Sequence, residues 1–461
     1  MKRNILIVLL SIFFVFLMSS CDFLGLEETN NDQSIANEVV SDGTYNYCLQ
    51  KDDTYFISCV NPSEILSLEI PKIYNEKTIS GIDKNGFKDC INLTSVIIPE
   101  SIISIGDYAF ANCSQLNDIV IPDNVNSIGK SSFSGCSMLK QISLPFVGKN
   151  RYNSSDEYHY PFGYIFGSEY YSGSNKTEQC YYNNDKASKI NYYIPETLTN
   201  VTITDDMFLQ NSAFYNCKNI EEVNLSDKIK AIGKSSFFSC YGLKDIVLPE
   251  NVTKIEPFTF MCCVSLASVH LGNNVNEIGN AAFMMCSSLN NINIPSSVKT
   301  IGEDAFYACY GLQDITLGNE LISIGEKAFY ECILLQNIVI PESVTQIGSY
   351  AFQGCKNLKS VYLPKGLTKL QIYVFSDCEK LESVVISGDV DYISYCAFYK
   401  CKSLTRVYVL GSNKLWDKKT DDNSYFYNAK TYYYSEDEPQ ASGNYWHYVD
   451  GIITVWNNQN T

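Results

Sequence analysis

The sequence predicts a repeat solenoid, a stack of 23-residue coils that is capped at both ends. Three observations predict it: a phenylalanine recurs in steps of 23 residues, a cysteine and a leucine follow it at fixed spacing, and a short strand pattern comes next. One coil cannot bury its own apolar positions, whereas stacked coils bury them against each other. We therefore expect short parallel strands joined by turns and 3₁₀-like segments.

Twelve copies of the repeat share one register. The ladder phenylalanines are Phe87, Phe110, Phe133, Phe214, Phe237, Phe260, Phe283, Phe306, Phe329, Phe352, Phe375 and Phe398. Three residues after each of them stands a ladder cysteine: Cys90, Cys113, Cys136, Cys217, Cys240, Cys263, Cys286, Cys309, Cys332, Cys355, Cys378 and Cys401. A leucine follows three residues later, with Ile220 as the exception. Twelve copies in a fixed register exclude chance.

The second half of each coil predicts a strand and a turn. Ile315 and Leu317 are two residues apart, and a spacing of two is typical of a short strand. Proline or glycine then ends the strand in most copies. A further glycine often stands four residues before the next ladder phenylalanine, and we expect it to turn with a positive φ. These glycines are Gly106, Gly129, Gly233, Gly279, Gly302, Gly325 and Gly348.

The ladder cysteines allow three interpretations. A metal site is excluded by the lack of a C-x-x-C motif and of histidine clusters. Disulfides are disfavoured because parallel stacked side chains hold their Cβ atoms about 5 Å apart, whereas a disulfide needs roughly 3.8 Å. A column of buried free thiols that act as small hydrophobic groups is the favoured interpretation. Cys48 and Cys59, off the ladder, are candidates for a pair within the N-terminal cap.

The repeat unit can be compared with a known family. The unit I-G-x-x-A-F-x-x-C-x-x-L-x-x-I-x-L, as in residues 301–317, resembles the BspA-type (Treponema-type) leucine-rich repeat, and the resemblance covers about 65–410. The period also lies within the range of leucine-rich repeats. The resemblance implies a leucine-rich repeat solenoid in a bacterial surface or secreted protein, from a family often discussed as adhesins.

Residues 1–20 predict a lipoprotein signal peptide. Lys2 and Arg3 precede an apolar run that is too short to span a membrane. The run ends in M-S-S-C, which resembles a bacterial lipoprotein signal and implies lipidation of Cys21. An ordinary signal peptide with an incidental cysteine is the alternative. Residues 21–44 are expected to form a flexible tether, so the expected location is the bacterial cell surface, with the N-terminal lipid as the only membrane attachment.

Both ends of the array leave the repeat pattern. Residues 45–82 are expected to form an N-terminal cap and a degenerate first coil, with a small β-hairpin in 45–64. The solenoid itself is expected over 83–410. Residues 411–461 carry all three tryptophans and are expected to form an aromatic C-terminal cap. The alternative for this segment is an aromatic platform for a ligand.

One step of the ladder is 81 residues long and indicates a tyrosine-rich insert at about 146–200. We expect one ordinary step plus 58 additional residues, and ten tyrosines fall in this interval. Long insertions in repeat proteins lie on one face, often the binding face, and tyrosine-rich loops make good recognition surfaces. Packing on the flank of the solenoid is an equally weighted alternative. The candidate ligand-binding residues in the insert are Tyr164, Tyr170, Tyr171, Tyr181 and Tyr182.

The outward positions of the predicted strands form a second candidate surface. They are polar and weakly charged, with β-branched residues at the centre, and the candidates on them are His270, Tyr362 and Tyr408. Such a surface suits a protein or a sugar bound through many hydrogen bonds. A solvated strand face without a ligand fits the same pattern.

Charge and motifs exclude several classes of function. The chain has 34 basic and 51 acidic residues, and a net charge of -17 disfavours binding to nucleic acid. No nucleophile elbow, P-loop, H-E-x-x-H or dinucleotide-binding motif is present, so we expect no enzyme, no cofactor and no metal. We expect a cell-surface binding or adhesion protein that recognises a host or environmental protein or glycan through the repeat face and the insert. A structural or self-assembling envelope scaffold without a foreign ligand is the alternative.

Overall fold

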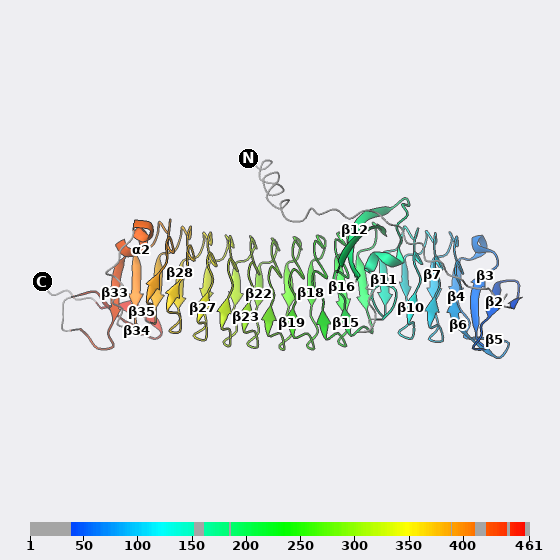
Figure 1. Ribbon diagram of the computed structural model, residues 1–461, viewed down its shortest axis with the longest axis horizontal. Helices are drawn as coiled ribbons and strands as arrows, with labels where there is room; N and C mark the ends of the chain where they lie inside the picture. Colours follow the sequence, from blue (N-terminus) through cyan, green and yellow to red (C-terminus); the bar gives the residue numbers. More distant parts are fainter. Residues whose placement is uncertain are drawn as a thin grey trace. The chain divides into compact units, whose positions relative to one another are not determined.

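The computed structural model describes residues 38–151, 161–183, 186–388, 390–410, 421–439 and 443–456. From Val39 onward the chain winds into coils that stack along one axis (Figure 1), so the predicted repeat solenoid is confirmed. The predicted signal peptide, Cys21 and most of the predicted tether lie outside the described residues. No helix among the described residues is long and apolar enough to span a membrane.

Each coil contributes one strand to a parallel series, whose outward side we call the strand face. In β18, Ile246 is buried while Asp245 and Val247 are exposed, as expected for a strand with one side on the core. The register is parallel, with Ile246 opposite Val269 of the next coil. The strands are β4 (Ser67–Glu69), β7 (Ser95–Ile97), β9 (Asp118–Val120), β11 (Gln141–Leu144), β14 (Asn200–Ile203), β16 (Glu222–Leu225), β18 (Asp245–Val247), β20 (Ser268–His270), β22 (Asn291–Asn293), β24 (Asp314–Thr316), β26 (Asn337–Val339), β28 (Ser360–Leu363), β30 (Ser383–Ile386) and β32 (Arg406–Val409).

A second parallel series, which the sequence pattern did not reveal, runs along another side of the coils. Most of its strands have only two residues, and an inward aliphatic residue such as Ile278 or Ile301 is fully buried. A two-residue strand leaves no alternation to detect in the sequence. The series comprises β6 (Lys77–Ile82), β8 (Ser104–Ile105), β10 (Ser127–Ile128), β15 (Phe208–Leu209), β17 (Ala231–Ile232), β19 (Lys254–Ile255), β21 (Glu277–Ile278), β23 (Thr300–Ile301), β25 (Ser323–Ile324), β27 (Gln346–Ile347), β29 (Lys369–Leu370) and β31 (Tyr392–Ile393).

The ladder phenylalanines form a buried aromatic stack along the solenoid. Phe283 and Phe306 are fully buried, and their ring centroids are 5.2 Å apart with an interplanar angle of 9°. The Phe283 amide donates to the Ala305 carbonyl of the next coil at 2.8 Å, so the backbone and the rings share one spacing. Offset stacking at this separation is a favourable arrangement for aromatic rings.

The ladder cysteines are free and buried, as the favoured interpretation predicts. Along the column a thiol donates to the carbonyl of the ladder phenylalanine in the preceding coil; Cys286 does so to Phe260 at 3.1 Å. Burial raises the pKa of the Cys309 thiol to about 12. At Cys113, at Cys136 and from Cys240 onward, the ladder thiol is therefore a neutral group that both fills space and donates to a carbonyl.

The glycines that stand four residues before a ladder phenylalanine do not have the positive φ that we expect of them. The left-handed residues stand instead two positions before and two positions after the ladder phenylalanine, for example Asp304 (φ 54°) and Ala308 (φ 54°) around Phe306. A Cβ atom at Gly325 would lie 2.6 Å from the backbone nitrogen of Glu303 in the preceding coil. The glycine is needed because two coils approach closely there, not because the chain turns.

The long ladder step contains two coils rather than the one that we expect. Strands β11 and β14 both lie between Phe133 and Phe214 and pair with each other in parallel. The missing rung comes from the 3₁₀ helix η2 (Phe162–Ile165): the Phe133 amide donates to the Ile165 carbonyl, and the Phe162 and Phe214 ring centroids are 5.0 Å apart. The additional residues are therefore fewer than predicted, because η2 replaces a rung without keeping the repeat spacing.

Small β structures lie at both ends of the coil stack. At the N-terminal end, β1 (Val39–Ser41), β2 (Tyr45–Leu49) and β3 (Tyr55–Cys59) form an antiparallel meander beside β6, with η1 (Pro62–Glu64) and β5 (Ile73–Tyr74) nearby in the chain. Cys48 lies opposite Phe56 in this meander, and the Cys59 sulfur is 3.7 Å from the Cys90 sulfur. The expected pairing of Cys48 with Cys59 is therefore wrong, because the strand register separates them.

At the C-terminal end, Phe426 continues the aromatic stack, with its ring centroid 4.6 Å from that of Phe398. Trp446 is fully buried, and its indole nitrogen donates to the Val409 carbonyl. This burial agrees with a cap rather than with an exposed platform at Trp446. The elements are η4 (Asp421–Asn423), α2 (Ser424–Asn428), β33 (Lys430–Tyr434), β34 (Tyr445–Val449) and β35 (Ile452–Val455).

We predict that the ladder thiols resist alkylation in the folded protein. At pH 8 the buried thiols are protonated, because burial raises their pKa, and only the thiolate reacts. Iodoacetamide labelling followed by peptide mass spectrometry should modify partly exposed Cys48 long before Cys286 or Cys332, and all of them should react in guanidinium chloride. Equal labelling rates for Cys48 and the ladder cysteines in native buffer would contradict a packed column.

Candidate functional site

The structure places the three strand-face candidates in different surroundings. His270 is exposed on β20, and Tyr362 on β28 is half-buried. Tyr408 is buried, with its ring centroid 5.3 Å from Tyr432 and 5.5 Å from Trp446. Tyr408 is therefore not available to a ligand, because the C-terminal segment covers it. The sequence does not indicate that this segment packs against β32.

The apolar residues of the strand face form a continuous run near its C-terminal end, where Val339, Tyr362, Val385 and Tyr408 lie opposite one another in successive strands, whereas polar residues interrupt them further toward the N-terminus. Val120, Val247 and Val339 are 63%, 63% and 75% exposed, but polar residues such as His270 and Asn293 separate them along the series. Among the described residues, no group of three or more His, Cys, Asp or Glu side chains is placed to hold a metal ion.

The tyrosines of the insert also do not converge on one site. Tyr164 is buried in η2, so its assignment as a ligand-binding residue is wrong: it belongs to the replacement rung. Tyr170 is 71% exposed, and its ring contacts that of Tyr193 edge to face. The hydroxyl of Tyr171 is buried, and burial raises the pKa of this group. Tyr181 and Tyr182 lie on β12, but their side chains are outside the described part of the structure.

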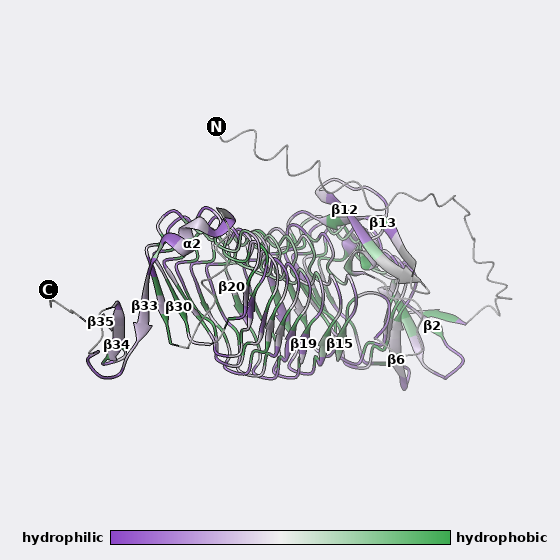
Figure 2. Cartoon of the chain, turned by 60° about the vertical axis from the view of Figure 1, so that its left-hand side comes forward, coloured by the Kyte–Doolittle hydropathy of each residue, from purple (hydrophilic) through white to green (hydrophobic). Residues whose placement is uncertain are grey.

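The longest regular element of the insert is a two-stranded antiparallel hairpin, formed by β12 (Ser174–Asn183) and β13 (Lys186–Pro195), which lies over the edge of the coils (Figure 2). Gln179 is fully buried and fixes the hairpin to its surroundings. Its side-chain oxygen accepts from the Gly163 amide at 2.6 Å, and its side-chain nitrogen donates to the Tyr215 carbonyl at 2.9 Å. The hairpin is thus held both to η2 and to the coil that follows it.

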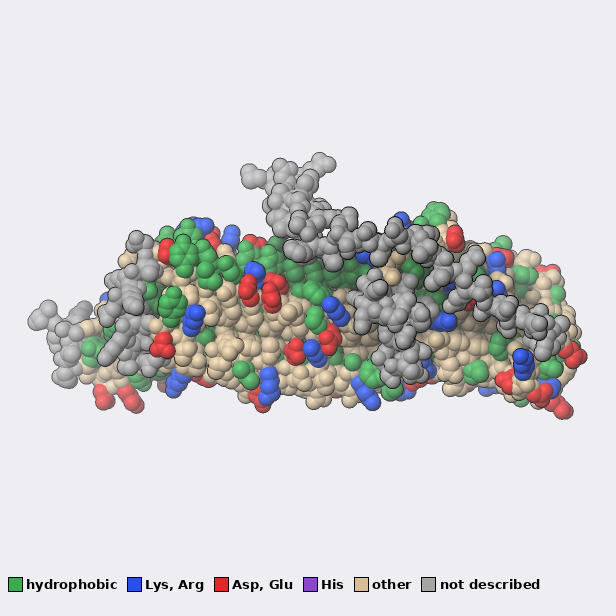
Figure 3. All heavy atoms as spheres, viewed as in Figure 1, with side chains coloured by type: hydrophobic (Ala, Val, Ile, Leu, Met, Phe, Trp, Pro, Cys, Tyr) green, Lys and Arg blue, Asp and Glu red, His purple; other side chains and the backbone are tan. Residues whose placement is uncertain are grey.

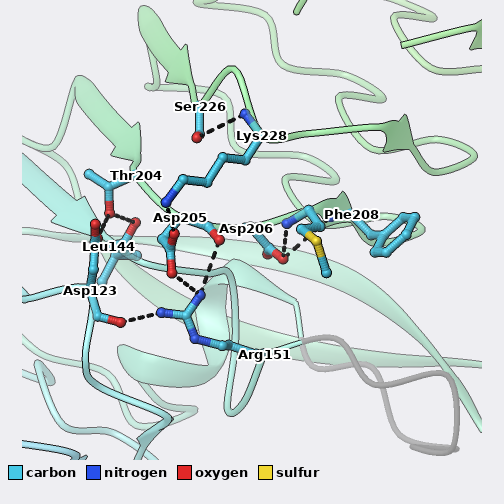
Figure 4. A network of polar contacts seen from close by, with 10 residues as sticks. Asp123, Leu144, Arg151, Thr204, Asp205, Asp206, Phe208, Ser226 and Lys228 are labelled. Carbon is cyan, nitrogen blue, oxygen red and sulfur yellow. Dashed lines mark hydrogen bonds and ion pairs between the residues drawn. The ribbon is translucent and has the colours of Figure 1, made fainter. Parts of the chain in front are cut away.

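A network of polar contacts ties the start of the insert to the coils (Figure 4). The Arg151 guanidinium binds the Asp205 carboxylate and donates to the Asp123 carbonyl, and Lys228 binds the other oxygen of Asp205. Burial opposes ionisation of Asp205, but the hydrogen bonds and charges of Lys228 and Arg151 outweigh it and lower its pKa. Burial raises the pKa of neighbouring Asp206 to about 6, because the backbone hydrogen bonds and the charge of Arg151 that favour its ionised form do not outweigh the burial.

A separate apolar feature outside the main core follows the aromatic stack. The residue directly after the ladder phenylalanine is aromatic or methionine in six consecutive coils, and we call these six residues the aromatic ridge. They are Tyr215, Phe238, Met261, Met284, Tyr307 and Tyr330. Figure 3 shows hydrophobic side chains gathered along the upper edge of the molecule, the edge at which α2 lies in Figure 1.

The side chains of the aromatic ridge contact each other from coil to coil. The rings of Tyr215 and Phe238 stack with centroids 4.7 Å apart, and those of Tyr307 and Tyr330 with centroids 4.8 Å apart. Met261 and Met284 form a buried cluster with Ala281, against which Phe238 and Tyr307 pack. The four aromatic members are half-buried, so the ridge is rigid yet retains exposed ring surface.

The aromatic ridge begins where the hairpin is attached. The Asn216 side chain donates to the Glu178 carbonyl of β12 at 2.8 Å, and the neighbouring Tyr215 carbonyl accepts from Gln179. The hairpin and the ridge are therefore parts of one continuous surface. The sequence does indicate this surface, because all six ridge residues stand directly after a ladder phenylalanine. The pattern is easy to miss because the residue at this position is aromatic in some coils and methionine in others.

Comparison with known families agrees with this architecture. A family model described as a BspA type leucine rich repeat region, in six copies, matches residues 62–156, 208–333 and 299–429. The chain belongs to this family. The BspA-type repeats thus span both the coils of the aromatic ridge and those on either side of the insert, and the hairpin lies between two matched segments.

Several solved structures are similar to this BspA-type chain. A leucine-rich repeat protein from Bacteroides ovatus is 23% identical, with 87% of this chain and 100% of that chain covered and a TM-score of 0.45. A leucine rich cell surface protein from Faecalibacterium prausnitzii is 23% identical, with 82% and 97% covered and a TM-score of 0.32. The leucine-rich repeat protein of T. pallidum is 24% identical, with 46% and 80% covered and a TM-score of 0.28. None of the curated proteins matches the chain.

We predict that Gln179→Leu loosens the hairpin without unfolding the coils. The substitution removes the hydrogen bonds of the buried amide to Gly163, Tyr215 and the Cys217 sulfur, and leaving a buried polar group unpaired costs about 1–3 kcal/mol. Hydrogen exchange read by mass spectrometry should become at least tenfold faster in β12 and β13 and stay unchanged in β23 and β25. The control is Glu178→Gln, which removes only the surface ion pair with Lys189. Unchanged exchange in β12 and β13 of the Leu variant would show that Gln179 does not anchor them.

Proposed function

We propose that this protein is a bacterial cell-surface binding protein that holds an extracellular protein partner on the aromatic ridge and the adjacent hairpin. The observation that carries the proposal is the continuous coil-to-coil contact of Tyr215, Phe238, Met261, Met284, Tyr307 and Tyr330 at the foot of the hairpin. Contiguous apolar patches on a folded protein mark interaction sites, and aromatic residues and methionine are enriched at interfaces.

The physical properties of the ridge suit a protein partner. Stacked rings in a rigid solenoid are already ordered, so little conformational entropy is lost on binding. Membership of the BspA-type family, whose repeats suggest protein binding or adhesion in general, supports the same assignment. Lipid attachment at Cys21 is part of the proposal, since it would hold the binding surface at the cell exterior.

We predict that a ridge variant loses binding. The ridge variant carries serine in place of Tyr215, Phe238, Tyr307 and Tyr330. Because aromatic residues dominate the energetics of interfaces, the affinity for the protein partner should fall at least tenfold. Binding to a panel of purified matrix proteins and mucins would be measured by biolayer interferometry. The matched control places serine at Ile97, Val120, Val247 and Val339, four exposed apolar residues of the strand face, and should bind like the original chain.

Two other outcomes would decide against the proposal. If the strand-face control loses binding and the ridge variant keeps it, the partner binds the strand face. If no panel member binds and light scattering shows concentration-dependent assembly that the ridge substitutions abolish, the ridge joins copies of this chain, as in an envelope scaffold. Thermal unfolding of both variants would identify a loss caused by misfolding.

A further inference from the structure

A second feature of the insert is a pocket at the base of the hairpin. Its volume is about 250 Å³, and it lies between the first residues of β12, the end of β13 and the coil segment 217–220. Ile194, Pro195 and Ile220 contribute apolar walls, and polar side chains complete the lining. The coil and the hairpin both contribute, so the pocket exists only because the insert is attached at this coil.

The charge of the pocket lining is opposite to that of the whole protein. Lys176 from β12 and Lys218 from the coil line the pocket, and no aspartate or glutamate does. Among the described residues, neither ammonium group has a carboxylate within ion-pair distance; Lys218 lies 5.3 Å from the centroid of the Tyr241 ring. The two lysines therefore make this pocket locally positive in a chain whose net charge is -17.

Neighbouring lysines behave differently. Lys189 on β13 forms an ion pair with Glu178 at 2.8 Å, and Lys244 in the next coil forms one with Glu221 at 2.5 Å. Glu178 and Glu221, which directly follow two lining segments, are thus occupied by other cations, whereas exposed Glu196, which follows Pro195, forms no ion pair among the described residues. The two pocket lysines are left with their charge available to an anionic ligand.

The remaining polar lining is neutral. Asn175, Thr177 and Asn219 contribute amide and hydroxyl groups. The Thr177 hydroxyl donates to the Asn175 carbonyl and the Asn219 side-chain amide donates to the Glu196 carbonyl, so their side-chain oxygens remain as acceptors. Such groups suit sugar hydroxyls, and the aliphatic walls suit the carbon–hydrogen face of a sugar ring. The volume is below the roughly 300–1,000 Å³ of pockets that hold drug-sized ligands, so a single sugar residue fits better than a longer ligand.

We propose that this pocket binds the carboxylate-bearing sugar residue of an acidic glycan, with Lys176 and Lys218 holding the carboxylate and the neutral side chains holding ring hydroxyls. Ammonium–carboxylate hydrogen bonds are stronger than those between neutral groups, and both lysines are exposed, so a ligand can reach their ammonium groups. An extended acidic peptide would need a groove with backbone partners along its length, which a pocket of this size does not provide. The site is distinct from the aromatic ridge and does not depend on the ridge being functional.

The test uses the full chain and free sugars. Saturation-transfer NMR and calorimetry would be run with N-acetylneuraminic acid, glucuronic acid, neutral glucose and a tetraglutamate peptide. We expect saturable binding of at least one of the two sugar acids, no binding of glucose, and weaker binding as NaCl is raised from 0.05 to 0.5 M. The two acids distinguish sialylated glycans from uronic-acid polymers as the source of the ligand.

Matched charge variants decide whether the pocket is responsible. The double variant Lys176→Gln, Lys218→Gln should weaken sugar-acid binding at least tenfold. The double variant Lys189→Gln, Lys244→Gln loses the same charge from the same hairpin and the adjoining coil, and it should bind like the original chain. The proposal would be overturned by equal loss of binding in both variants, by binding of glucose, or by preference for tetraglutamate. It would also be overturned if no probe binds to protein that still shows its normal unfolding transition.

Discussion

The whole structure depends on the requirement that every coil bury its apolar side against the next coil at one fixed spacing. The buried rings of Phe283 and Phe306 and the backbone hydrogen bond between their coils have to satisfy the same separation. A cysteine suits the position beside the ring because its thiol is small, apolar and able to donate to a carbonyl of the neighbouring coil. At Gly325 the same closeness excludes even a Cβ atom. Stability therefore resides in contacts between neighbours, as in other linear repeat proteins.

This constraint also explains why a binding surface can develop on the coils. Because the ladder phenylalanine is fixed, the residue after it emerges at the same place in every coil. Two aromatic side chains at that position, as at Tyr307 and Tyr330, necessarily stack, and their centroid separation of 4.8 Å is close to the spacing of the strands. The ridge thus needs no additional scaffold. The hairpin, held by Gln179 and the Arg151 network, ends this surface on one side and adds a pocket of different chemistry.

The repeat period was sufficient to predict the coils, the inward strand residues and the buried thiols, because those features follow from spacing alone. The repeat period does not reveal why residue 325 is glycine. A close approach between coils and a left-handed turn both favour glycine, and the sequence does not distinguish them. Tyr164 and Tyr408 were misjudged for a related reason. Their burial results from segments outside the repeat, η2 and the C-terminal strands, whose positions no periodicity records. The pocket at Lys176 and Lys218 joins residues from the insert and a coil, so its lining is visible only in three dimensions.

The central claim is that a partner binds the aromatic ridge, and footprinting of a bound complex tests it directly. The chain would be exposed to hydroxyl radicals alone and with the matrix protein or mucin that it binds, and oxidation would be read by mass spectrometry. The account predicts protection of Tyr215, Phe238, Tyr307 and Tyr330, with the oxidation of His270 on the strand face unchanged. Protection of His270 with unchanged oxidation of the four ridge residues would contradict it.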